Sequence, residues 1–214
     1  MNVLLIGANG KIAREFVKKA SQEKKEIQVK AMIRKEEQKE DLLQLGASEV
    51  VIADLEKDIH HAFTEVDAVI FAAGSGGHTG GDKTLLVDLW GAMKSVDAAK
   101  KHGIHRFCMI SSMRAKTPEK GPESIRHYLV AKMVADDYLR DSGLDYTIIR
   151  PGILTNDAPT GHVHIQETIE ETGEITRADV AHVLLSVLDN PNTYRKSFDV
   201  IGGDIPIEKA VAQI

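Results

Sequence analysis

The chain has 214 residues, a length that suits one large α/β domain or two small ones. Hydrophobic residues make up 43% of it and charged residues 28%, ordinary globular values that argue against disordered, collagen-like and coiled-coil classes. The net charge of -5, with no dense run of Lys and Arg, argues against nucleic acid as a partner.

The first apolar run of the chain, within MNVLLIGANG, is too short for a signal-peptide core or a membrane span. The single cysteine, Cys108, lies in another apolar run and is expected to be a buried thiol without a disulfide partner. Such a thiol suits a reducing compartment. We therefore expect a cytoplasmic protein that has no membrane partner.

Short apolar runs, each bounded by Gly, Asp or charged residues, predict six strands, at residues 3–6, 29–33, 50–52, 68–72, 107–110 and 146–149. Helix-length stretches separate these strands. Alternation of this kind is typical of a parallel sheet covered by helices on both faces, the doubly wound α/β architecture. Gly46 and Gly103 follow helical patterns at the point where a left-handed cap is expected.

Two helical stretches have apolar residues at three- and four-residue steps, so each is expected to bury an apolar stripe. The residues are Leu85, Leu86, Leu89, Trp90, Met93 and Val96 in the first, and Val180, Val183, Leu184, Val187 and Leu188 in the second. Asp179 lies early in the second helix.

The segment from Pro151 to Thr176 lacks sustained periodicity and is rich in Gly and Pro, which predicts a long functional loop. After the second helix, a strand is expected near 198–201 and a short helix from Pro206. This remainder is too small for an independent domain. We expect a single domain over residues 1–214, in which residues 151–214 contribute a small substrate lobe.

The first strand runs into the sequence GANGKIA at residues 7–13, a GxxGxxA pattern that opens a helix. Glycines allow a tight turn and close approach to a pyrophosphate, whose charge is favoured by the free N–H groups of a helix N-terminus. The pattern predicts a dinucleotide site whose contacts include Gly7, Asn9, Gly10, Lys11 and Ile12. A Walker phosphate loop is excluded because no GxxxxGK[ST] sequence is present.

Arg34 follows the second strand, where an acidic residue would hold the ribose hydroxyls of NAD. A guanidinium there can bind a 2′-phosphate, which predicts NADP(H) as the cofactor. The alternative is a solvated basic turn in which Arg34 pairs with Glu36 or Glu37.

The third and fourth strands also end at the edge where the nucleotide is expected. The residues there are Asp54 and Leu55 after one strand, and Ala72, Ala73 and Gly74 after the other. Asp54 is expected either to meet the adenine amino group or to cap a helix. The glycine-rich segment Gly74–Gly81 is either a loop that closes over the cofactor or a plain surface loop.

Ser111 and Ser112 follow the fifth strand, and Tyr128 and Lys132 lie four apart in the next helical stretch. This spacing places a phenol and an ammonium on one helix face, where the positive charge is expected to lower the pKa of Tyr128. The alternative is an ordinary amphipathic helix in which Tyr128 packs and Lys132 extends to solvent.

At these residues the chain resembles the short-chain dehydrogenase/reductase superfamily, in particular its small atypical NmrA-like branch. The resemblance covers essentially the whole chain and rests on GANGKIA, Arg34, ADL at 53–55, FAAG at 71–74, ISS at 110–112, YLVAK at 128–132 and RPGIL at 150–154. It implies a Rossmann-like fold and an NAD(P) cofactor. The implied cofactor contacts also take in Ser111, Tyr128 and Lys132.

The resemblance also implies roles for particular residues. Tyr128 acts as general acid or base, and Lys132 holds the nicotinamide ribose and tunes the tyrosine. Ser112, or alternatively Ser111, bonds the substrate oxygen. The nicotinamide end is lined by Pro151, Gly152, Ile153 and Leu154.

The combined expectation is an NADP(H)-dependent oxidoreductase that transfers hydride to a small carbonyl or similar electrophile. A non-catalytic dinucleotide sensor is the alternative, and a sugar epimerase or dehydratase is disfavoured by the short C-terminal part. No metal site is expected, because His162 and His164 have no acidic or Cys partner at ligand spacing. The partner is a small-molecule substrate, and the protein is expected to be a monomer or weak dimer.

Overall fold

The computed structural model describes residues 1–22, 27–77 and 79–214. Its main sheet has the strand order β11-β8-β10-β6-β5-β4-β1-β2-β3. From β10 to β3 all neighbours are parallel, whereas β8 runs antiparallel to β10 and to β11. The strands are β1 (Asn2–Ile6), β2 (Gln28–Ile33), β3 (Glu49–Ile52), β4 (Ala68–Phe71), β5 (Arg106–Ile110), β6 (Asp145–Pro151), β8 (His162–Gln166), β10 (Lys196–Gly202) and β11 (Ile205–Pro206).

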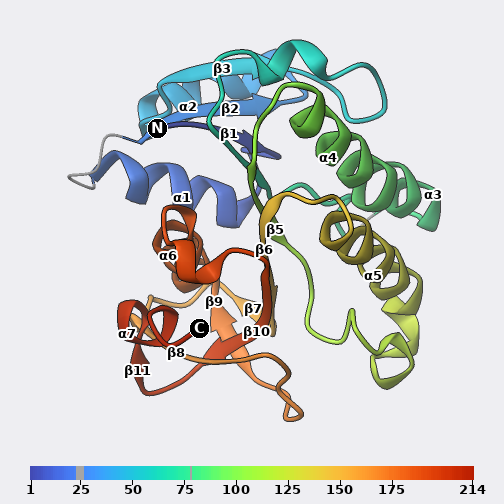
Figure 1. Cartoon of the computed structure of the whole chain (residues 1–214), viewed down its shortest axis with the longest axis vertical. Coiled ribbons are helices and arrows are strands. Elements are labelled where there is room, and N and C mark those ends of the chain that lie inside the picture. The colour runs from blue at the N-terminus through green and yellow to red at the C-terminus, as the bar shows by residue number, and fades with distance from the viewer. Residues whose placement is uncertain (23–26, 78) are drawn as a thin grey trace.

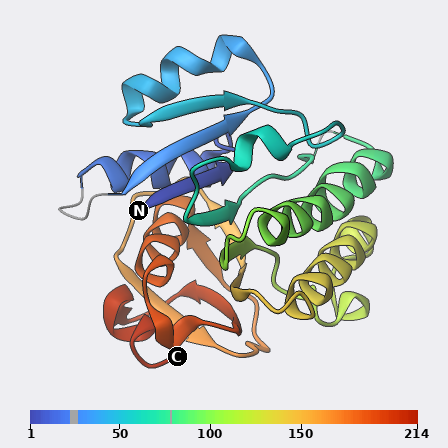
Figure 2. The ribbon, with the colours of Figure 1, turned by 45° about the horizontal axis from the view of Figure 1, so that its top comes forward.

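Helices cover both faces of this sheet (Figures 1 and 2). One face packs against α1 (Lys11–Gln22), α2 (Lys39–Leu45), α6 (Arg177–Leu188) and α7 (Ile207–Val211), and the other against α4 (Ala92–Lys101) and α5 (Arg126–Arg140). Alternate residues of β1 enter the two cores, since Val3 and Leu5 join one cluster while Leu4 and Ile6 join the other. The predicted doubly wound architecture is therefore confirmed.

The predicted local features of the core are also present. Gly46 and Gly103 adopt positive φ values of 117° and 70° at helix ends, and Cys108 is a buried free thiol. Among the described residues, none of the helices combines the length and apolarity that a bilayer span requires.

The chain changes direction across the sheet between β1 and β4. From β1 it proceeds to β2 and β3 on one side, and then returns to β4, β5 and β6 on the other. In sheets of this kind the loops after the two central strands leave on opposite faces, which opens a crevice at their carboxyl ends. Most of the predicted nucleotide residues follow strands that end at this edge, whereas Tyr128 and Lys132 lie on α5.

The prediction of one long loop from Pro151 to Thr176 is wrong. The segment contains β7 (Ile153–Thr155), β8 and β9 (Glu174–Thr176), and β7 pairs with β9 in a small parallel sheet. The sequence of β8, HVHIQ, alternates polar and apolar residues, and Val163 at its second position is fully buried. This alternation of polar and apolar residues was the signal that the sequence prediction missed. It is easily overlooked because the surrounding Gly and Pro residues limit it to a very short segment.

The predicted apolar stripe from Leu85 to Val96 is wrong in its first half. Residues 84–91, between α3 (Gly81–Lys83) and α4, form a π-helical segment, and Leu85 and Trp90 are 57% and 43% exposed. The buried residues of this segment are instead Thr84, Asp88 and Gly91. In a π-helix the backbone hydrogen bonds join residues five apart rather than four. Apolar side chains spaced for an α-helix therefore turn away from the core.

A buried carboxylate holds the entry into α6. Asp179 is 2% exposed and accepts hydrogen bonds from the backbone N–H groups of Thr160 and Gly161, both at 2.9 Å. It also accepts from the hydroxyls of Thr160 and Thr176, at 3.3 and 2.8 Å. These bonds connect the segment before β8 to the first turn of α6.

We predict that Asp179→Ala lowers the free energy of unfolding by about 2–4 kcal/mol, because donors of Thr160, Gly161 and Thr176 lose a buried charged acceptor at once. Urea unfolding measures the change. Asp204→Asn is the control, since Asp204 is exposed and its substitution should leave the midpoint unchanged. Equal stability of the two variants would contradict the role assigned to Asp179.

Candidate functional site

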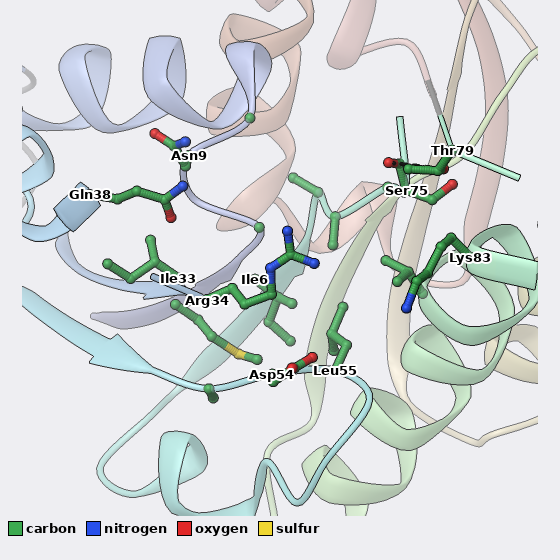
Figure 3. A pocket seen from close by; sticks show the side chains of 18 residues that line it. Ile6, Asn9, Ile33, Arg34, Gln38, Asp54, Leu55, Ser75, Thr79 and Lys83 are labelled. Atoms are coloured by element: carbon green, nitrogen blue, oxygen red, sulfur yellow. Dashed lines mark hydrogen bonds between the residues drawn. The ribbon is translucent and has the colours of Figure 1, made fainter. Parts of the chain in front are cut away.

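A cavity of about 530 Å³ lies at the carboxyl ends of β1, β2, β3 and β4 (Figure 3). Its lining includes many residues that the sequence assigned to a nucleotide, namely Gly7, Asn9, Gly10, Arg34, Asp54, Leu55, Ala72, Ala73 and Gly74. Sequence reasoning missed Gln38, Lys83 and Val87, which also line it, as do Ser75 and Thr79. Ser75 and Thr79 belong to the glycine-rich segment after β4, of which His78 lies outside the described residues.

Gly7 permits the close approach that shapes this cavity. Its φ is +80°, and a Cβ built on it would lie 2.6 Å from the Cα atom of Ala73 at the end of β4. Only glycine tolerates both conditions. Helix α1 then begins at Lys11, so the unbonded N–H groups of its first turn face the same edge.

Arg34 leaves the end of β2 and points into the cavity (Figure 3). Its guanidinium forms no ion pair or hydrogen bond with any residue of the described ranges. The alternative pairing is not observed, because Glu37 pairs with Lys35 at 3.2 Å and Glu36 with Lys39 at 3.5 Å. Arg34 is therefore available to an anion in the cavity.

The opposite wall of the cavity also carries charge. Lys83 of α3 binds both carboxylate oxygens of Glu56, at 2.6 and 2.8 Å, which raises the pKa of its ammonium. Asp54 lines the cavity and accepts the backbone N–H of Glu56 at 3.0 Å. Asp54 thus caps a turn rather than the helix that one of its two predicted roles required, and it faces the cavity.

The predicted Ser, Tyr and Lys residues lie next along the same edge, outside the lining of this cavity. Ser111 and Ser112 follow β5, and Tyr128 and Lys132 are on α5. The structure brings Tyr128 and Ser112 together, because hydrogen bonding by the Ser112 hydroxyl acts on the phenol. Ser111 is 4% exposed and lies instead near Asp136.

The expectation that Lys132 lowers the pKa of Tyr128 is wrong for this structure. Burial, together with the carboxylates of Asp88 and Asp136, raises the pKa of the phenol well above its ordinary value, and only Ser112 opposes this. Tyr128 is therefore a protonated phenol at neutral pH. Such a group can donate a proton, whereas it is a poor base.

Lys132 is turned into the protein rather than toward solvent. It is 1% exposed and its Nζ atom donates to the carbonyl oxygen of Ile110 at 2.8 Å. Burial lowers the pKa of its ammonium, and the carboxylates of Asp136 and Asp88 oppose this effect. The alternative in which Lys132 extends to solvent is wrong.

Two buried carboxylates that sequence reasoning missed surround Lys132. Asp136 follows it by four residues on α5, and burial raises its pKa to about 6 in spite of the nearby ammonium. Asp88 lies in the π-helical segment, is 1% exposed and accepts the backbone N–H of Ser75 at 3.0 Å. The four-residue spacing of Tyr128, Lys132 and Asp136 was a readable signal, whereas nothing in the sequence marked Asp88.

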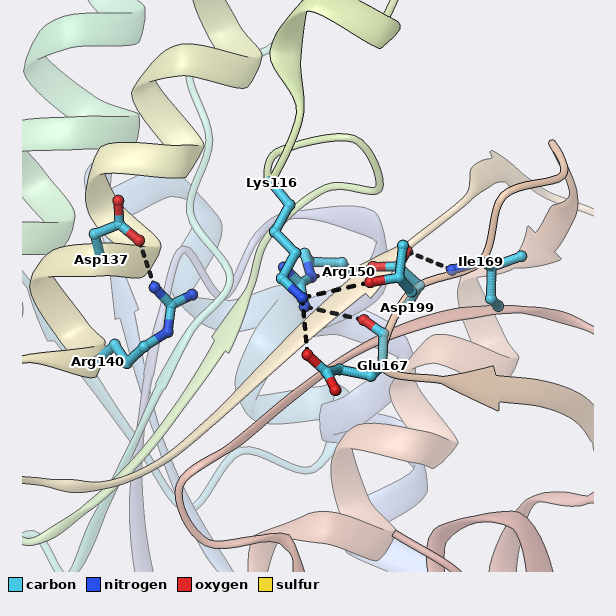
Figure 4. Close-up of polar contacts among 8 residues, drawn as sticks. Lys116, Asp137, Arg140, Arg150, Glu167, Ile169 and Asp199 are labelled. Atoms are coloured by element: carbon cyan, nitrogen blue, oxygen red, sulfur yellow. Dashed lines mark hydrogen bonds and ion pairs between the residues drawn. The ribbon is translucent and has the colours of Figure 1, made fainter.

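The segment predicted for the nicotinamide end follows a buried ion pair. Arg150 of β6 is fully buried and binds Asp199 of β10 at 3.0 Å, as Figure 4 shows. Beyond it, Gly152 donates to the carbonyl oxygen of Val200 at 3.0 Å. A Cβ on Gly152 would lie 2.3 Å from the carbonyl oxygen of Gly173, so the backbone here passes too close for a side chain.

The remaining predicted contacts lie at the margins of this edge. Lys11 is exposed at the start of α1 and Ile12 is partly buried against the core, and neither lines the larger cavity. Pro151 is buried, Ile153 is 54% exposed and Leu154 is partly buried. Within the described ranges, no three His, Cys, Asp or Glu side chains gather as a metal-ligand group.

Comparisons with known proteins agree with this geometry. A model of the NAD(P)H-binding family matches residues 7–191. The chain is 47% identical over its whole length, and over the whole relative, to a Bacillus subtilis (strain 168) protein named "Uncharacterized sugar epimerase YhfK". It is 27% identical to sanguinarine reductase of Eschscholzia californica, covering 94% of this chain and 88% of the relative.

The chain is also similar to a solved structure described as "Putative NAD-dependent epimerase/dehydratase from Bacillus halodurans". The TM-score between the two is 0.97. They are 51% identical, with full coverage of both chains. The strand order, the crevice between β1 and β4 and these similarities lead to one conclusion: the chain belongs to the NAD(P)H-binding family of atypical short-chain dehydrogenase/reductase-like Rossmann proteins.

Proposed function

We propose that this protein is an NADP(H)-dependent oxidoreductase that reduces a small carbonyl compound or a similar electrophile. One observation carries the proposal: a protonated, partly buried Tyr128 beside Ser112 lies on the same sheet edge as the dinucleotide cavity. The reductase among its relatives supports the same class of reaction.

The residues fit the cofactor. The Gly7 turn brings backbone and the N-terminus of α1 to the position of a pyrophosphate, and the cavity beyond it suits the adenosine half. Arg34, which has no acidic partner among the described residues, supports a 2′-phosphate and therefore NADP(H) over NAD(H). Pro151–Leu154 would flank the nicotinamide.

When bound, the reduced nicotinamide supplies a hydride to the electrophilic carbon. The Ser112 hydroxyl orients the carbonyl oxygen, and the Tyr128 phenol gives that oxygen its proton as the C=O bond becomes a C–O single bond. The products are an alcohol and the oxidised cofactor. Tyr128 then recovers a proton from solvent.

A dinucleotide sensor without turnover remains the second candidate, and the position of Lys132 favours it. The bond of its ammonium to the Ile110 carbonyl leaves it directed away from solvent. A screen of NADPH oxidation with quinones, aldehydes, flavins and small ketones separates the two functions. Binding of NADPH without any turnover across the screen would favour the sensor.

Localisation and oligomeric state are two further predictions. We propose that the protein is cytoplasmic, and that it is a monomer or weak dimer. The exposed Leu85 and Trp90 leave apolar surface on the π-helical segment, so light scattering at micromolar concentration is the direct test of oligomeric state. A stable dimer would overturn the proposed monomer.

We predict that NADP(H) binds at least about tenfold more tightly than NAD(H), a difference of ~1.4 kcal/mol, because Arg34 meets the 2′-phosphate. Titration calorimetry with both nucleotides measures the preference. Arg34→Ala should abolish it and leave NAD(H) affinity nearly unchanged. A variant that keeps the preference would remove Arg34 from this role.

We predict that Tyr128 stays protonated at pH values up to about 10, where an ordinary tyrosine is half ionised. Tyr128→Phe should therefore leave the near-ultraviolet tyrosinate signal of the cofactor-free protein unchanged up to that pH. The measurement needs no substrate. A clear loss of signal in the variant would show that Tyr128 ionises in the ordinary range.

We predict that Tyr128→Phe lowers turnover by at least about 10²-fold, the low end of what a positioned acid contributes, while NADPH affinity stays nearly intact. Ser112→Ala should reduce turnover more than its neighbour Ser111→Ala, which is the matched control. Steady-state kinetics with any substrate found in the screen decides this. If the Tyr128→Phe variant turned over the substrate at the rate of the parent protein, Tyr128 would be a packing residue and not the proton donor.

A further inference from the structure

A second, smaller cavity of about 250 Å³ lies beside the dinucleotide edge, between the start of α1 and the start of α6. Three cationic side chains line it, those of Lys11, Arg14 and Arg177. The acidic residues of the same lining are Glu15 and Asp157, so the positive charges outnumber the negative ones by one.

In the described part of the chain, Lys11, Arg14 and Arg177 form no ion pair, although Glu15 and Asp157 lie in the same lining. Their partners are neutral. The side-chain oxygen of Asn9 accepts from Arg14 at 3.0 Å, and the Leu154 carbonyl and Asn156 side chain accept from Arg177 at 3.1 and 2.9 Å.

Those bonds position the two guanidinium groups but leave donors free. Each guanidinium has five N–H donors, and the bonds of both arginines to the described residues involve only the Nη1 atom. The N-terminus of α1, a helix of twelve residues that begins with Lys11, adds to the positive potential, whereas the first turn of α6 carries the buried carboxylate of Asp179. A monoanion with planar geometry, a carboxylate, suits this arrangement.

The position of the cavity indicates which molecule brings the carboxylate. The Gly7 turn separates the two cavities, since Gly10 lines the larger one and Lys11 the smaller one, and no residue lines both. Arg34 is already assigned to the 2′-phosphate of the cofactor, and the Gly7 turn to its pyrophosphate. The bond from Arg177 to Leu154 instead connects the smaller cavity to the segment assigned to the nicotinamide end.

We propose that Arg14 and Arg177 form a subsite for a carboxylate on the substrate, so that the enzyme prefers acidic electrophiles to neutral ones. The proposal rests on the proposed reductase function, which it deepens by naming a substrate class. Lys11 adds positive charge at the mouth of the same cavity.

The test compares 4-carboxybenzaldehyde with its neutral methyl ester, methyl 4-formylbenzoate, as substrates for NADPH oxidation. The parent protein should have a lower KM for the acid. R177Q and R14Q should each raise the KM for the acid by about tenfold, as loss of a charge-assisted bond implies, and leave the KM for the ester and the NADPH affinity within about twofold. K18Q, on the same helix as Arg14 but outside the lining, is the matched control and should change neither KM.

Three results would overturn the subsite. An equal rise in KM for acid and ester would assign the arginines a structural role, and a matching loss of NADPH affinity would assign them to the phosphates of the cofactor. Equal KM values for acid and ester in the parent protein would show that no carboxylate is recognised. R14Q keeps the test valid if R177Q fails to fold.

Failure of the proposed function gives a separate signature. If NADPH binds but neither aldehyde is reduced, the reductase assignment fails for aldehydes, and the subsite is then tested by binding alone. Saturation-transfer NMR of 4-(hydroxymethyl)benzoate with the NADP-loaded protein should give a signal that R177Q removes. No signal with the parent protein would overturn the subsite.

Discussion

The contact between Gly7 and Ala73 is the constraint on which the nucleotide edge depends. The backbone after β1 passes so close to the end of β4 that no side chain fits at residue 7, and its φ of +80° excludes most other residues. This close turn sets the start of α1, and α1 packs against α6 across the same face of the sheet. The larger cavity and the cluster at Lys11, Arg14 and Arg177 both depend on that placement.

Buried charge connects the proposed reaction site to the C-terminal strands. Lys132 and Arg150 are both almost inaccessible to solvent, and their charges are balanced by Asp88, Asp136 and Asp199. Removing one partner of such a buried pair typically costs 3–5 kcal/mol, on the order of a third of the stability of a small domain. The Arg150–Asp199 pair fixes β10 against β6 at the residue before Pro151. The charge of Arg150 also acts on Asp136, which in turn acts on Tyr128.

Some cations of the described residues are paired with carboxylates, such as Lys30 and Lys116, at 3.1 and 2.9 Å. At the nucleotide edge Lys83 is paired with Glu56, whereas Arg34, Arg14 and Arg177 have no such partner among the described residues. In a chain of net charge -5, this leaves a local positive region where an anionic cofactor and an acidic substrate would bind, and a concave surface strengthens such a field.

The sequence by itself determined the strands from β1 to β6 and their alternation with helices, the strand near 198–201, the glycine turn and Arg34. Each of these depends on residues that are close in the chain: apolar runs set strands, and a turn with positive φ requires glycine within a few residues of the strand end. The YxxxK spacing likewise placed Tyr128 and Lys132 on one helix face. That spacing could not predict that the pKa of Tyr128 is raised, because the shift is caused by burial and by Asp88, forty residues away.

Tertiary structure alone decided the rest. The π-helical segment at 84–91 turns Leu85 and Trp90 outward and Asp88 inward, a change of register that local periodicity does not encode. The short strands β7 and β9 pair with each other and β8 pairs with β10, so their formation depends on segments distant in the chain as well as on local pattern. The cluster of Arg14 and Arg177 joins residues 163 positions apart, since electrostatic and packing energies depend on distance in space and not on separation in sequence.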